Sequence, residues 1–236
     1  MRDPATVAPR FRTLAGLERC LVGCRACPRL VRWRERVGRV RRAAYRDWTY
    51  WARPVPGFGD PRARLVILGL APGAHGGNRT GRVFTGDRSG DFLYAALHRA
   101  GLANQPTAWS VDDGLVLHDV WITLSARCVP PGNRPLPVEL ARCSPWLDAE
   151  LRLIRPQVVL ALGAIAWVAM LGHFRRRGVE VPRPAPRFAH GAELAVPGAP
   201  RLVGAYHVSQ QNTQTGRLTP AMFDQVLRQA CEELGG

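Results

Sequence analysis

Four short apolar runs, each followed by a helical pattern, limit the folds open to this chain of 236 residues. The runs occupy positions 65–70, 120–126, 158–162 and 202–207. Apolar runs of this length are typical of parallel strands that are buried on both faces. Strands that alternate with helices form βαβ units, with helices on both faces of one sheet. The sequence therefore predicts an α/β fold with three layers, α/β/α, around a central, mostly parallel four-stranded sheet.

Four helical patterns lie between and after these runs. Apolar residues recur on one face of 90–101, and the segment 137–155 begins with a proline, as many helices do. The segment 163–174 is apolar nearly all round, which is typical of a buried helix. The last helix is predicted over 220–235, with Thr219 as its N-cap.

Two regions differ in composition. Residues 1–60 carry helical pieces with many basic and aromatic side chains, whereas residues 61–236 hold the strand and helix patterns. We expect the first region to pack on the second, with its Trp and Tyr side chains more often in a core than stacked on bases. Within the second region, 172–200 is rich in proline and arginine and is expected to be irregular.

The chain is strongly basic, with 33 Lys and Arg against 18 Asp and Glu and a formal net charge of +15. A GC-rich genome enriches arginine and accounts for part of this excess, but it does not account for the scarcity of acidic residues. The balance favours a polyanionic partner, nucleic acid before an anionic membrane. No apolar run approaches the roughly 20 residues of a membrane span, and the N-terminus lacks the apolar core of a signal peptide. We therefore expect a cytoplasmic protein with no membrane partner, and a monomer by default.

The cysteines indicate a metal site rather than disulfides, because a cytoplasmic chain keeps its thiols reduced. Two residues separate Cys24 from Cys27, and fourteen separate Cys128 from Cys143. Four thiolates together hold either tetrahedral zinc or a four-iron cluster. The wide second spacing is unusual for zinc, so iron–sulfur is preferred. Cys20 completes the three-cysteine pattern of radical SAM enzymes, but this chain lacks the length and the repeats of their barrel.

Polar loops follow the strands at one predicted edge of the sheet. In such sheets ligands bind beyond the carboxyl ends of the strands, so the loops that start at Ala71, Arg127 and Val208 are expected to form one site. The first loop, "GLAPGAHGGNRTGRVFTGD", is rich in glycine and arginine but matches neither the dinucleotide fingerprint nor a P-loop. The last strand ends at His207 and is followed by Ser, Gln, Asn and Thr, which offer donors without a carboxylate.

These motifs resemble family 5 (B-type) uracil-DNA glycosylases, which are repair enzymes that carry a [4Fe-4S] cluster. The resemblance rests on "GLAPGAHGGNRTGRVFTGD", on "HVSQQNTQTGRLT", on "CVPPGNRP" and on the cysteines, and it covers the chain from Cys24 to about Pro220. It implies the α/β/α fold of that family, DNA that contains uracil as the partner, and hydrolysis of the bond between a deaminated base and its sugar. It also implies a structural [4Fe-4S] cluster with the ligands Cys24, Cys27, Cys128 and Cys143.

The resemblance also implies a role for each polar residue near the sheet edge. His207 would donate a hydrogen bond to a uracil carbonyl oxygen as charge grows on the leaving base, and Phe84 would stack on the flipped base. Asn78 would position the hydrolytic water, with His75 and Asp87 behind it. The turn of the first loop would line the base pocket with Ala71, Pro72 and Gly73. DNA contacts are expected from Ser209, Gln211, Asn212, Arg79, Arg82 and Arg217.

Two positions depart from the pattern of the relatives. Family 4 enzymes carry a carboxylate where this chain has Leu70, and many relatives carry an asparagine that reads the uracil edge where it has Leu124. Leucine cannot make those hydrogen bonds, so the general base is not obvious and specificity is expected to extend to bases such as hypoxanthine or xanthine. One alternative is a catalytically weak iron–sulfur DNA-binding protein of the same fold. Another is a family 6-like enzyme that stays bound to DNA through a histidine, although no inserted basic loop lies near Arg79.

Overall fold

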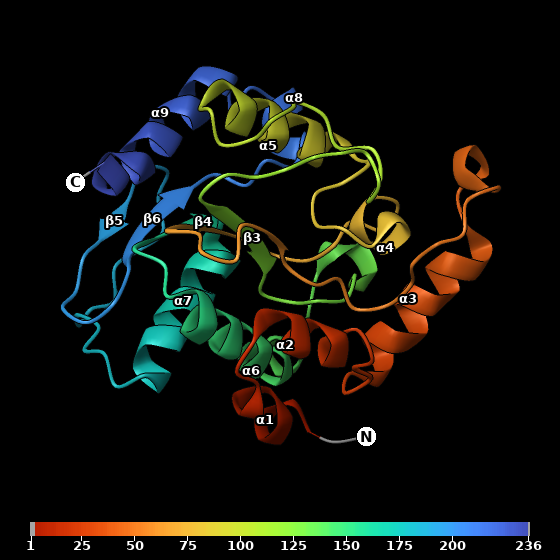
Figure 1. Ribbon diagram of the computed structural model, residues 1–236, viewed down its shortest axis with the longest axis horizontal. Helices are drawn as coiled ribbons and strands as arrows, with labels where there is room; N and C mark the ends of the chain where they lie inside the picture. The colour runs from red at the N-terminus through yellow and green to blue at the C-terminus, as the bar shows by residue number, and fades with distance from the viewer. Residues whose placement is uncertain (1–2, 236) are drawn as a thin grey trace.

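A six-stranded sheet forms the centre of the computed structural model, which describes residues 3–235 (Figure 1). Its strand order is β1-β3-β2-β4-β6-β5. The four central strands are parallel and confirm the predicted runs: β2 (Leu65–Gly69), β3 (Val120–Leu124), β4 (Val158–Leu162) and β6 (Arg201–Ala205). The predicted number of strands was too small, because the two-residue strands β1 (Phe58–Gly59) and β5 (Glu193–Leu194) add antiparallel pairs at the edges.

Helices occupy the predicted intervals between the central strands. The described helices are α1 (Pro4–Val7), α2 (Leu14–Leu21), α3 (Pro28–Val40), α4 (Gly77–Thr80), α5 (Arg88–Arg99), α6 (Pro137–Ile154), α7 (Ala164–Arg176), α8 (Gln210–Gln214) and α9 (Pro220–Cys231). Thr219 caps α9 as predicted, since its side chain accepts a hydrogen bond from the Met222 N–H at 3.2 Å. After α9 a 3₁₀ turn continues to Gly235.

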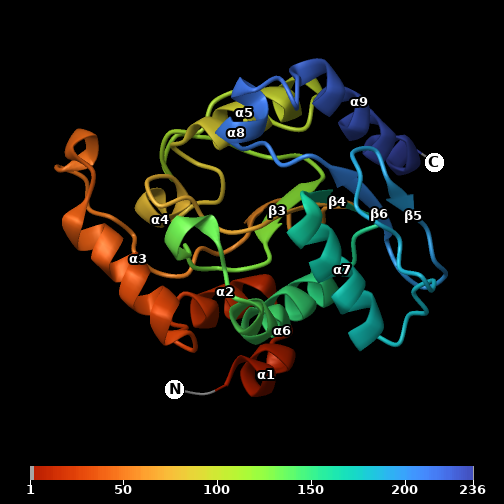
Figure 2. The same cartoon turned by 180° about the vertical axis from the view of Figure 1, so that it is seen from behind.

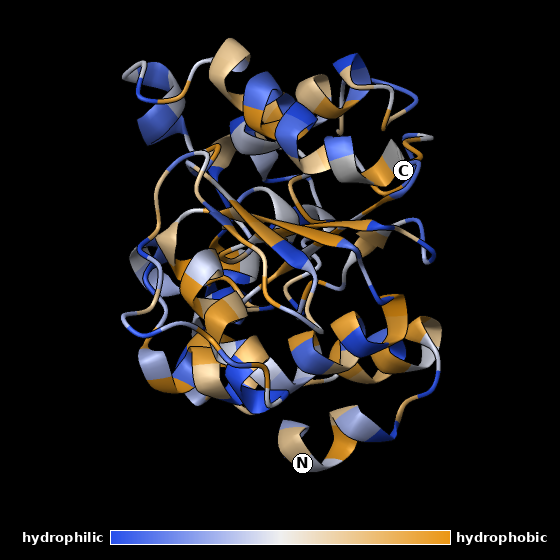
Figure 3. Cartoon of the chain, turned by 90° about the vertical axis from the view of Figure 1, so that its left-hand side faces the viewer, coloured by the Kyte–Doolittle hydropathy of each residue, from blue (hydrophilic) through white to orange (hydrophobic). Residues whose placement is uncertain are grey.

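Helices cover both faces of the sheet, so the expected three layers are present (Figures 1 and 2). Along β2, Leu65 and Ile67 point into one core with α5 and α9, whereas Val66 and Leu68 point into the other with α6 and α7. All four side chains are fully buried, and each such burial contributes about 1.5–3 kcal/mol. Figure 3 shows the strands as an apolar layer between these helices.

The N-terminal region packs on the main layers and also extends them. Leu17 and Leu21 of α2 share a third small core with Trp146 and Ala149 of α6. This region also supplies β1, which pairs with β3, so the region is part of the sheet as well as packed against it. The segment 172–200 holds only the end of α7 and the strand β5 among regular elements, in line with its predicted irregularity. Within the described residues, no helix combines the length and apolar character needed to cross a membrane.

Candidate active site and cysteine cluster

A cavity of about 310 Å³ lies at the carboxyl ends of the parallel strands. The loops after β2, β3 and β6 meet around it, as the predicted strand arrangement requires. Its volume suits one small ligand. The cavity is lined by Leu70, Ala71, Gly73, Phe84, Asp87, Ser89, Leu124, Asn133, His207, Ser209 and Gln211.

An aromatic side chain, Phe84, forms one wall of this pocket. Its φ angle is 47°, in the left-handed region that bulky residues seldom adopt. Gly69 makes the placement possible, because a Cβ there would lie 2.8 Å from the Phe84 ring and 2.9 Å from Leu124. The Phe84 ring is also close to His207, with 6.2 Å between the ring centroids. The end of β2 thus lets an aromatic ring and an imidazole share one pocket.

His207 follows β6 and faces the pocket with both ring nitrogens free of hydrogen bonds to other described residues. Asn212 holds the backbone of this residue, because its Nδ2 donates to the His207 carbonyl at 2.8 Å. Gly163 lies beside the His207 side chain and has a φ of 91°, which favours glycine; a Cβ there would be in ordinary contact with the His207 Cβ, at 3.4 Å. Burial lowers the pKa of His207 to about 4, so the imidazole is neutral at physiological pH.

Asp87 brings a carboxylate into the same pocket. Its Oδ1 caps α5 by accepting a hydrogen bond from the Gly90 N–H at 3.0 Å. Its Oδ2 lies against the glycine-rich loop, where a Cβ on Gly73 or Gly76 would approach within 2.7 Å or 1.8 Å. Burial raises the pKa of Asp87, although the N–H groups of Ser89 and Gly90 act in the opposite direction. The glycines therefore serve to admit a carboxylate that sequence reasoning had placed in a secondary role.

Asn78 lies outside the pocket, which contradicts its predicted role beside the hydrolytic water. The residue is part of the short helix α4 and its side chain is fully buried. Its Nδ2 donates to the Arg34 carbonyl at 3.4 Å, away from the sheet edge. A side chain in this position contacts the backbone of α3 and does not line the cavity at the sheet edge.

Arg79 was predicted to contact phosphates, and the structure contradicts this because the residue is 3% exposed. Its guanidinium lies between two aromatic rings, 4.0 Å from the Tyr45 centroid and 4.1 Å from the Trp48 centroid. It also donates to the carbonyls of His75 and Gly86, at 2.6 and 2.8 Å. Arg79 therefore fastens the glycine-rich loop to the segment after α3 through stacking and hydrogen bonds.

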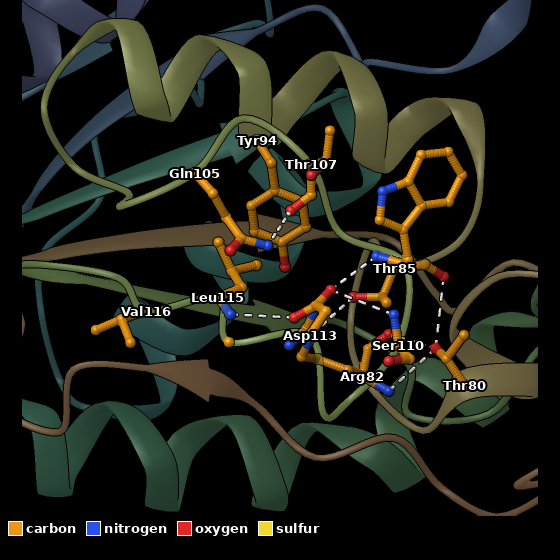
Figure 4. A network of polar contacts seen from close by, with 12 residues as sticks. Thr80, Arg82, Thr85, Tyr94, Gln105, Thr107, Ser110, Asp113, Leu115 and Val116 are labelled. Carbon is orange, nitrogen blue, oxygen red and sulfur yellow. Dashed lines mark hydrogen bonds and ion pairs between the residues drawn. The ribbon is translucent and has the colours of Figure 1, made fainter.

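Arg82 is likewise buried, at 5% exposure, and its predicted phosphate contact is wrong for the same reason. Its guanidinium pairs with Asp113 at 2.6 Å and donates to Thr85 Oγ1 at 2.9 Å (Figure 4). Asp113 in turn accepts hydrogen bonds from the N–H groups of Trp109 and Leu115. The pair joins the glycine-rich loop to the loop that precedes β3 and leaves no free charge for DNA.

The other predicted DNA contacts remain at or near the surface. Ser209 and Gln211 line the pocket, and Arg217 is exposed with its guanidinium 4.8 Å from the Tyr206 ring centroid. Asn212 instead positions His207, as described above. Pro72 is buried behind the pocket wall, where a Cβ on Gly77 would lie 3.2 Å from it.

A second cavity of about 520 Å³ adjoins the base pocket and shares Gly73, Asp87, Ser89, Asn133, Ser209 and Gln211 with it. His75 lies here rather than in the base pocket, and its Nδ1 is 3.0 Å from the Tyr50 hydroxyl. Arg42 and Arg88 also line this groove; both are exposed, and neither pairs with another described residue. The groove thus carries the free positive charge that Arg79 and Arg82 lack.

The predicted cluster cysteines surround one small, largely apolar cavity. They reach it from the turn before α3, from the loop after β3 and from α6, and all are free thiols: Cys24, Cys27, Cys128 and Cys143. Burial raises the pKa of Cys128 to about 11 and that of Cys143 to about 12. Among residues 3–235, no group of three or more His, Cys, Asp and Glu side chains is placed to hold a metal ion.

Two buried arginines contact the sulfurs of these cysteines. Arg34 Nη1 lies 2.9 Å from Cys128 Sγ, and the Arg127 N–H donates to Cys143 Sγ at 3.3 Å. Glu150 pairs with the Arg127 guanidinium. Even so, Arg34 Nε and two nitrogens of Arg127 are buried without a hydrogen-bond partner in the described structure. Unpaired buried donors of this kind favour an anionic group in the cavity.

Comparison with known proteins decides the family. A family model described as "Uracil DNA glycosylase superfamily" matches residues 56–231, which hold the whole sheet and the base pocket. The chain belongs to the uracil-DNA glycosylase superfamily. This superfamily member is 56% identical over 209 residues to a type-5 uracil-DNA glycosylase of Mycobacterium tuberculosis, covering 88% of this chain and 76% of the relative. It is 55% identical over 212 residues to that of Thermus thermophilus, covering 89% and 93%. A type-4 enzyme of Thermotoga maritima is 36% identical over 113 residues, covering 48% and 51%. The predicted resemblance to family 5 is confirmed.

Several residues in the site of this uracil-DNA glycosylase superfamily member were not assigned from the sequence. Asn133 and Ser89 line both cavities, and Asn133 has a left-handed φ of 56°. The motif "CVPPGNRP" contains Asn133 and was a usable signal. Nothing in the sequence indicates that Arg42 belongs to the site, because its neighbours in the sequence are equally basic. Only the fold places Arg42 beside the glycine-rich loop.

Proposed function

We propose that this member of the superfamily is a monofunctional uracil-DNA glycosylase that acts in DNA repair. It extrudes a uracil nucleotide from DNA and hydrolyses the C1′–N1 bond, which leaves free uracil and an abasic site. One observation carries the proposal: a single pocket of about 310 Å³ brings together Phe84, a neutral His207 and the carboxylate of Asp87. One chain supplies all three groups, so a monomer suffices. The printed names of the type-5 relatives support the same activity.

The pocket binds the flipped base between apolar and polar walls. Phe84 stacks on the base, and Leu70 and Leu124 contribute apolar surface where a hydrogen-bonding edge would otherwise be read. Asn133 and Ser89 supply polar atoms at the rim. Because the leucines demand no particular donor or acceptor, we expect hypoxanthine or xanthine to be accepted beside uracil.

Charge on the departing uracil is stabilised by His207. When the C1′–N1 bond breaks, its electron pair stays on the base, and negative charge spreads to the carbonyl oxygens. The neutral imidazole donates an N–H to one of them, and such a donor typically contributes about 2.7–4 kcal/mol. The low pKa of His207 keeps this donor neutral across the physiological range.

The hydrolytic water is oriented by Asp87, which takes the place of the predicted Asn78. The water oxygen bonds to C1′, and its proton passes to the Asp87 carboxylate as the positive charge on the sugar is quenched. Burial raises the pKa of this carboxyl, which makes it a better proton acceptor than an exposed aspartate. Asp87, at the end of the glycine-rich loop, thereby takes the role of the carboxylate that family 4 enzymes carry at the position of Leu70.

The four cysteines that line one cavity supply the donor set of a [4Fe-4S] cluster, and Cys24, Cys27, Cys128 and Cys143 would hold it, although their side chains are not arranged to hold a single metal ion. Such a cluster with four thiolates is anionic; Arg127 lines the cavity, and Arg34 contacts the Cys128 sulfur. Two of the ligands come from the N-terminal region and two from the main domain. When bound, the cluster cross-links these regions, and its role is structural rather than chemical.

Replacing Arg34 by methionine should speed loss of iron to a chelator by about tenfold, as loss of an outer-shell partner commonly does. Arg34 is 2% exposed and contacts Cys128, so the change removes charge that offsets the cluster. The measurement is iron content and visible absorbance against time. Arg36→Met on the exposed side of the same helix is the matched control, and Cys143→Ser should prevent loading. Equal iron loss in the Arg34 and Arg36 variants would remove Arg34 from this role.

The second cavity binds the DNA backbone beside the flipped nucleotide, through Arg42 and Arg88. Arg42→Ala or Arg88→Ala should each lower the slope of log affinity against log salt by about 0.9 for duplex DNA, the contribution of one phosphate contact. Arg62→Ala, an exposed residue at the turn before β2, removes the same charge elsewhere and should leave the slope unchanged. Anisotropy titrations with labelled duplex at several salt concentrations measure the slope. An unchanged slope in both the Arg42 and the Arg88 variant would contradict binding of the DNA backbone in this cavity.

An assay of base release decides between this function and its alternatives. Oligonucleotides with uracil, hypoxanthine or xanthine, in single and double strands, should yield free base and an alkali-labile abasic site. Damage-dependent binding with no base release would instead identify a DNA-binding protein without catalysis. A protein–DNA adduct that survives denaturant would identify the covalent family 6-like route.

A further inference from the structure

The segment 172–200, which the glycosylase function does not use, borders a cavity of about 680 Å³. This cavity lies where Gln157 leads into β4 and Pro200 leads into β6. It is therefore at the amino ends of the strands, opposite the pocket that holds His207, and residues from the last turns of α6 and α7 line it. Figure 2 shows these two helices. The lining residues are Leu151, Arg152, Arg155, Pro156, Gln157, His173, Phe174, Arg177, Val179, Gly198, Ala199 and Pro200.

The charge of this cavity is positive and largely uncompensated. Arg152, Arg155 and Arg177 line it, and its lining contains no Asp or Glu. Arg155 and Arg177 are exposed, and neither makes a side-chain hydrogen bond or ion pair within residues 3–235. Among the described residues, Arg152 donates to two backbone carbonyls, those of Pro9 and Phe11. By contrast, the neighbouring Arg176 is paired with Asp148 at 2.7 Å. An anionic ligand would supply the missing partners.

The C-terminal ends of two helices lie at this cavity. Both α6 and α7 end at the cavity, with Arg155 and Arg177 as their C-caps. Helix C-termini leave carbonyl oxygens without intrahelical partners and carry the negative end of the helix dipole. Phosphate groups bind preferentially at helix N-termini, where N–H groups face them. In α7 the carbonyls of His173, Phe174 and Arg175 already accept hydrogen bonds from the N–H groups that follow the helix. The groups of this cavity that lack partners are therefore its arginines, and the carboxylates of a peptide would supply them.

The floor of the cavity is apolar. Phe174 and Leu151 belong to the core beneath the sheet, and Val179 and Ala199 pack against that core while partly exposed. We propose that this cavity binds an acidic peptide segment of a partner protein, with an apolar side chain on Phe174 and Val179 and carboxylates at Arg155 and Arg177. Because the base pocket lies at the other end of the sheet, the peptide and DNA bind at the same time.

Fluorescence anisotropy of the whole protein with a labelled Asp-Asp-Asp-Leu-Phe peptide tests this site. Arg155→Glu and Arg177→Glu should each weaken binding by about tenfold at low ionic strength, since an attraction becomes a repulsion, and the effect should shrink as salt screens these exposed charges. Arg187→Glu, an exposed residue of the same segment outside the lining, is the matched control and should bind like the native protein. A peptide with Gly-Gly in place of Leu-Phe should bind about tenfold more weakly, because it loses the apolar contact.

Three results would overturn the proposal: no binding of the peptide, equal loss of binding in the Arg187 control, or displacement of the peptide by a duplex without uracil. The last result would identify the cavity as a second nucleic-acid site. Release of uracil by the Arg155 and Arg177 variants should match that of the native protein. The peptide titration needs no base release, so it stands whether or not the glycosylase assay succeeds.

Discussion

Replacing Asp87 by asparagine is expected to slow uracil release in single-turnover assays by about 100-fold or more, the usual scale for a general base. The amide cannot accept the proton of the attacking water. Asparagine is nearly isosteric and remains a good N-cap, so the hydrogen bond from the Gly90 N–H and the start of α5 should persist. A 100-fold loss corresponds to about 2.7 kcal/mol in the barrier, and unfolding should be little changed.

The pH profile provides the sharper test of Asp87. Only the ionised carboxylate accepts the proton, so the rate should fall as pH falls through the pKa of Asp87. Burial raises that pKa. The acid limb of the pH–rate profile, where the rate falls at low pH, should therefore lie above the ordinary aspartate pKa of about 3.9. The limb should vanish in Asp87→Asn. Asp3→Asn, which alters the N-cap of the remote helix α1, is the matched control. An acid limb that survives in Asp87→Asn would assign the base to another group.

The sheet was predictable because its central strands are continuous apolar runs. β2, β3 and β4 are buried at every position, and Thr123 of β3 is their one polar residue. Short runs of this kind between turns are typical of a strand that helices cover on both faces. The edge strands β1 and β5 have two residues each and are partly exposed. Neither alternation nor a run can be recognised over two residues, so their pairing follows from tertiary contacts alone.

The residues that line the pocket were easier to predict from the sequence than the exposure of individual arginines, for one physical reason. His207 and Phe84 follow from the rule that loops after parallel strands meet at one edge. For an arginine within such a loop, the side chain points inward or outward according to partners that are distant in sequence. Tyr45 and Trp48 stack on Arg79, and Asp113 pairs with Arg82. Positive charge in the motif therefore predicted a polyanionic partner, but the fold buries two of the arginines that the motif contains, Arg79 and Arg82.

Replacing His207 by alanine is expected to lower the single-turnover rate about 100-fold, the scale measured for loss of one donor to a developing oxyanion. The affinity for DNA should change little, because the imidazole acts on charge that appears only as the bond breaks. His207→Gln retains an N–H donor and should recover part of the rate. His118→Ala, an exposed histidine before β3, is the matched control.

The two active-site variants should also differ in pH dependence. The pKa of His207 is lowered to about 4, so this residue stays neutral at physiological pH and adds no titration there. His207→Ala should therefore lower the pH-independent rate above the acid limb and keep the limb itself. Asp87→Asn should remove the limb. If His207→Ala shifts the limb instead, the two groups titrate together and the imidazole takes part in proton transfer to the water. If the alanine variant retains the native rate, stabilisation of the leaving uracil must come from the other polar groups of the pocket, of which Asn133 is the first to test.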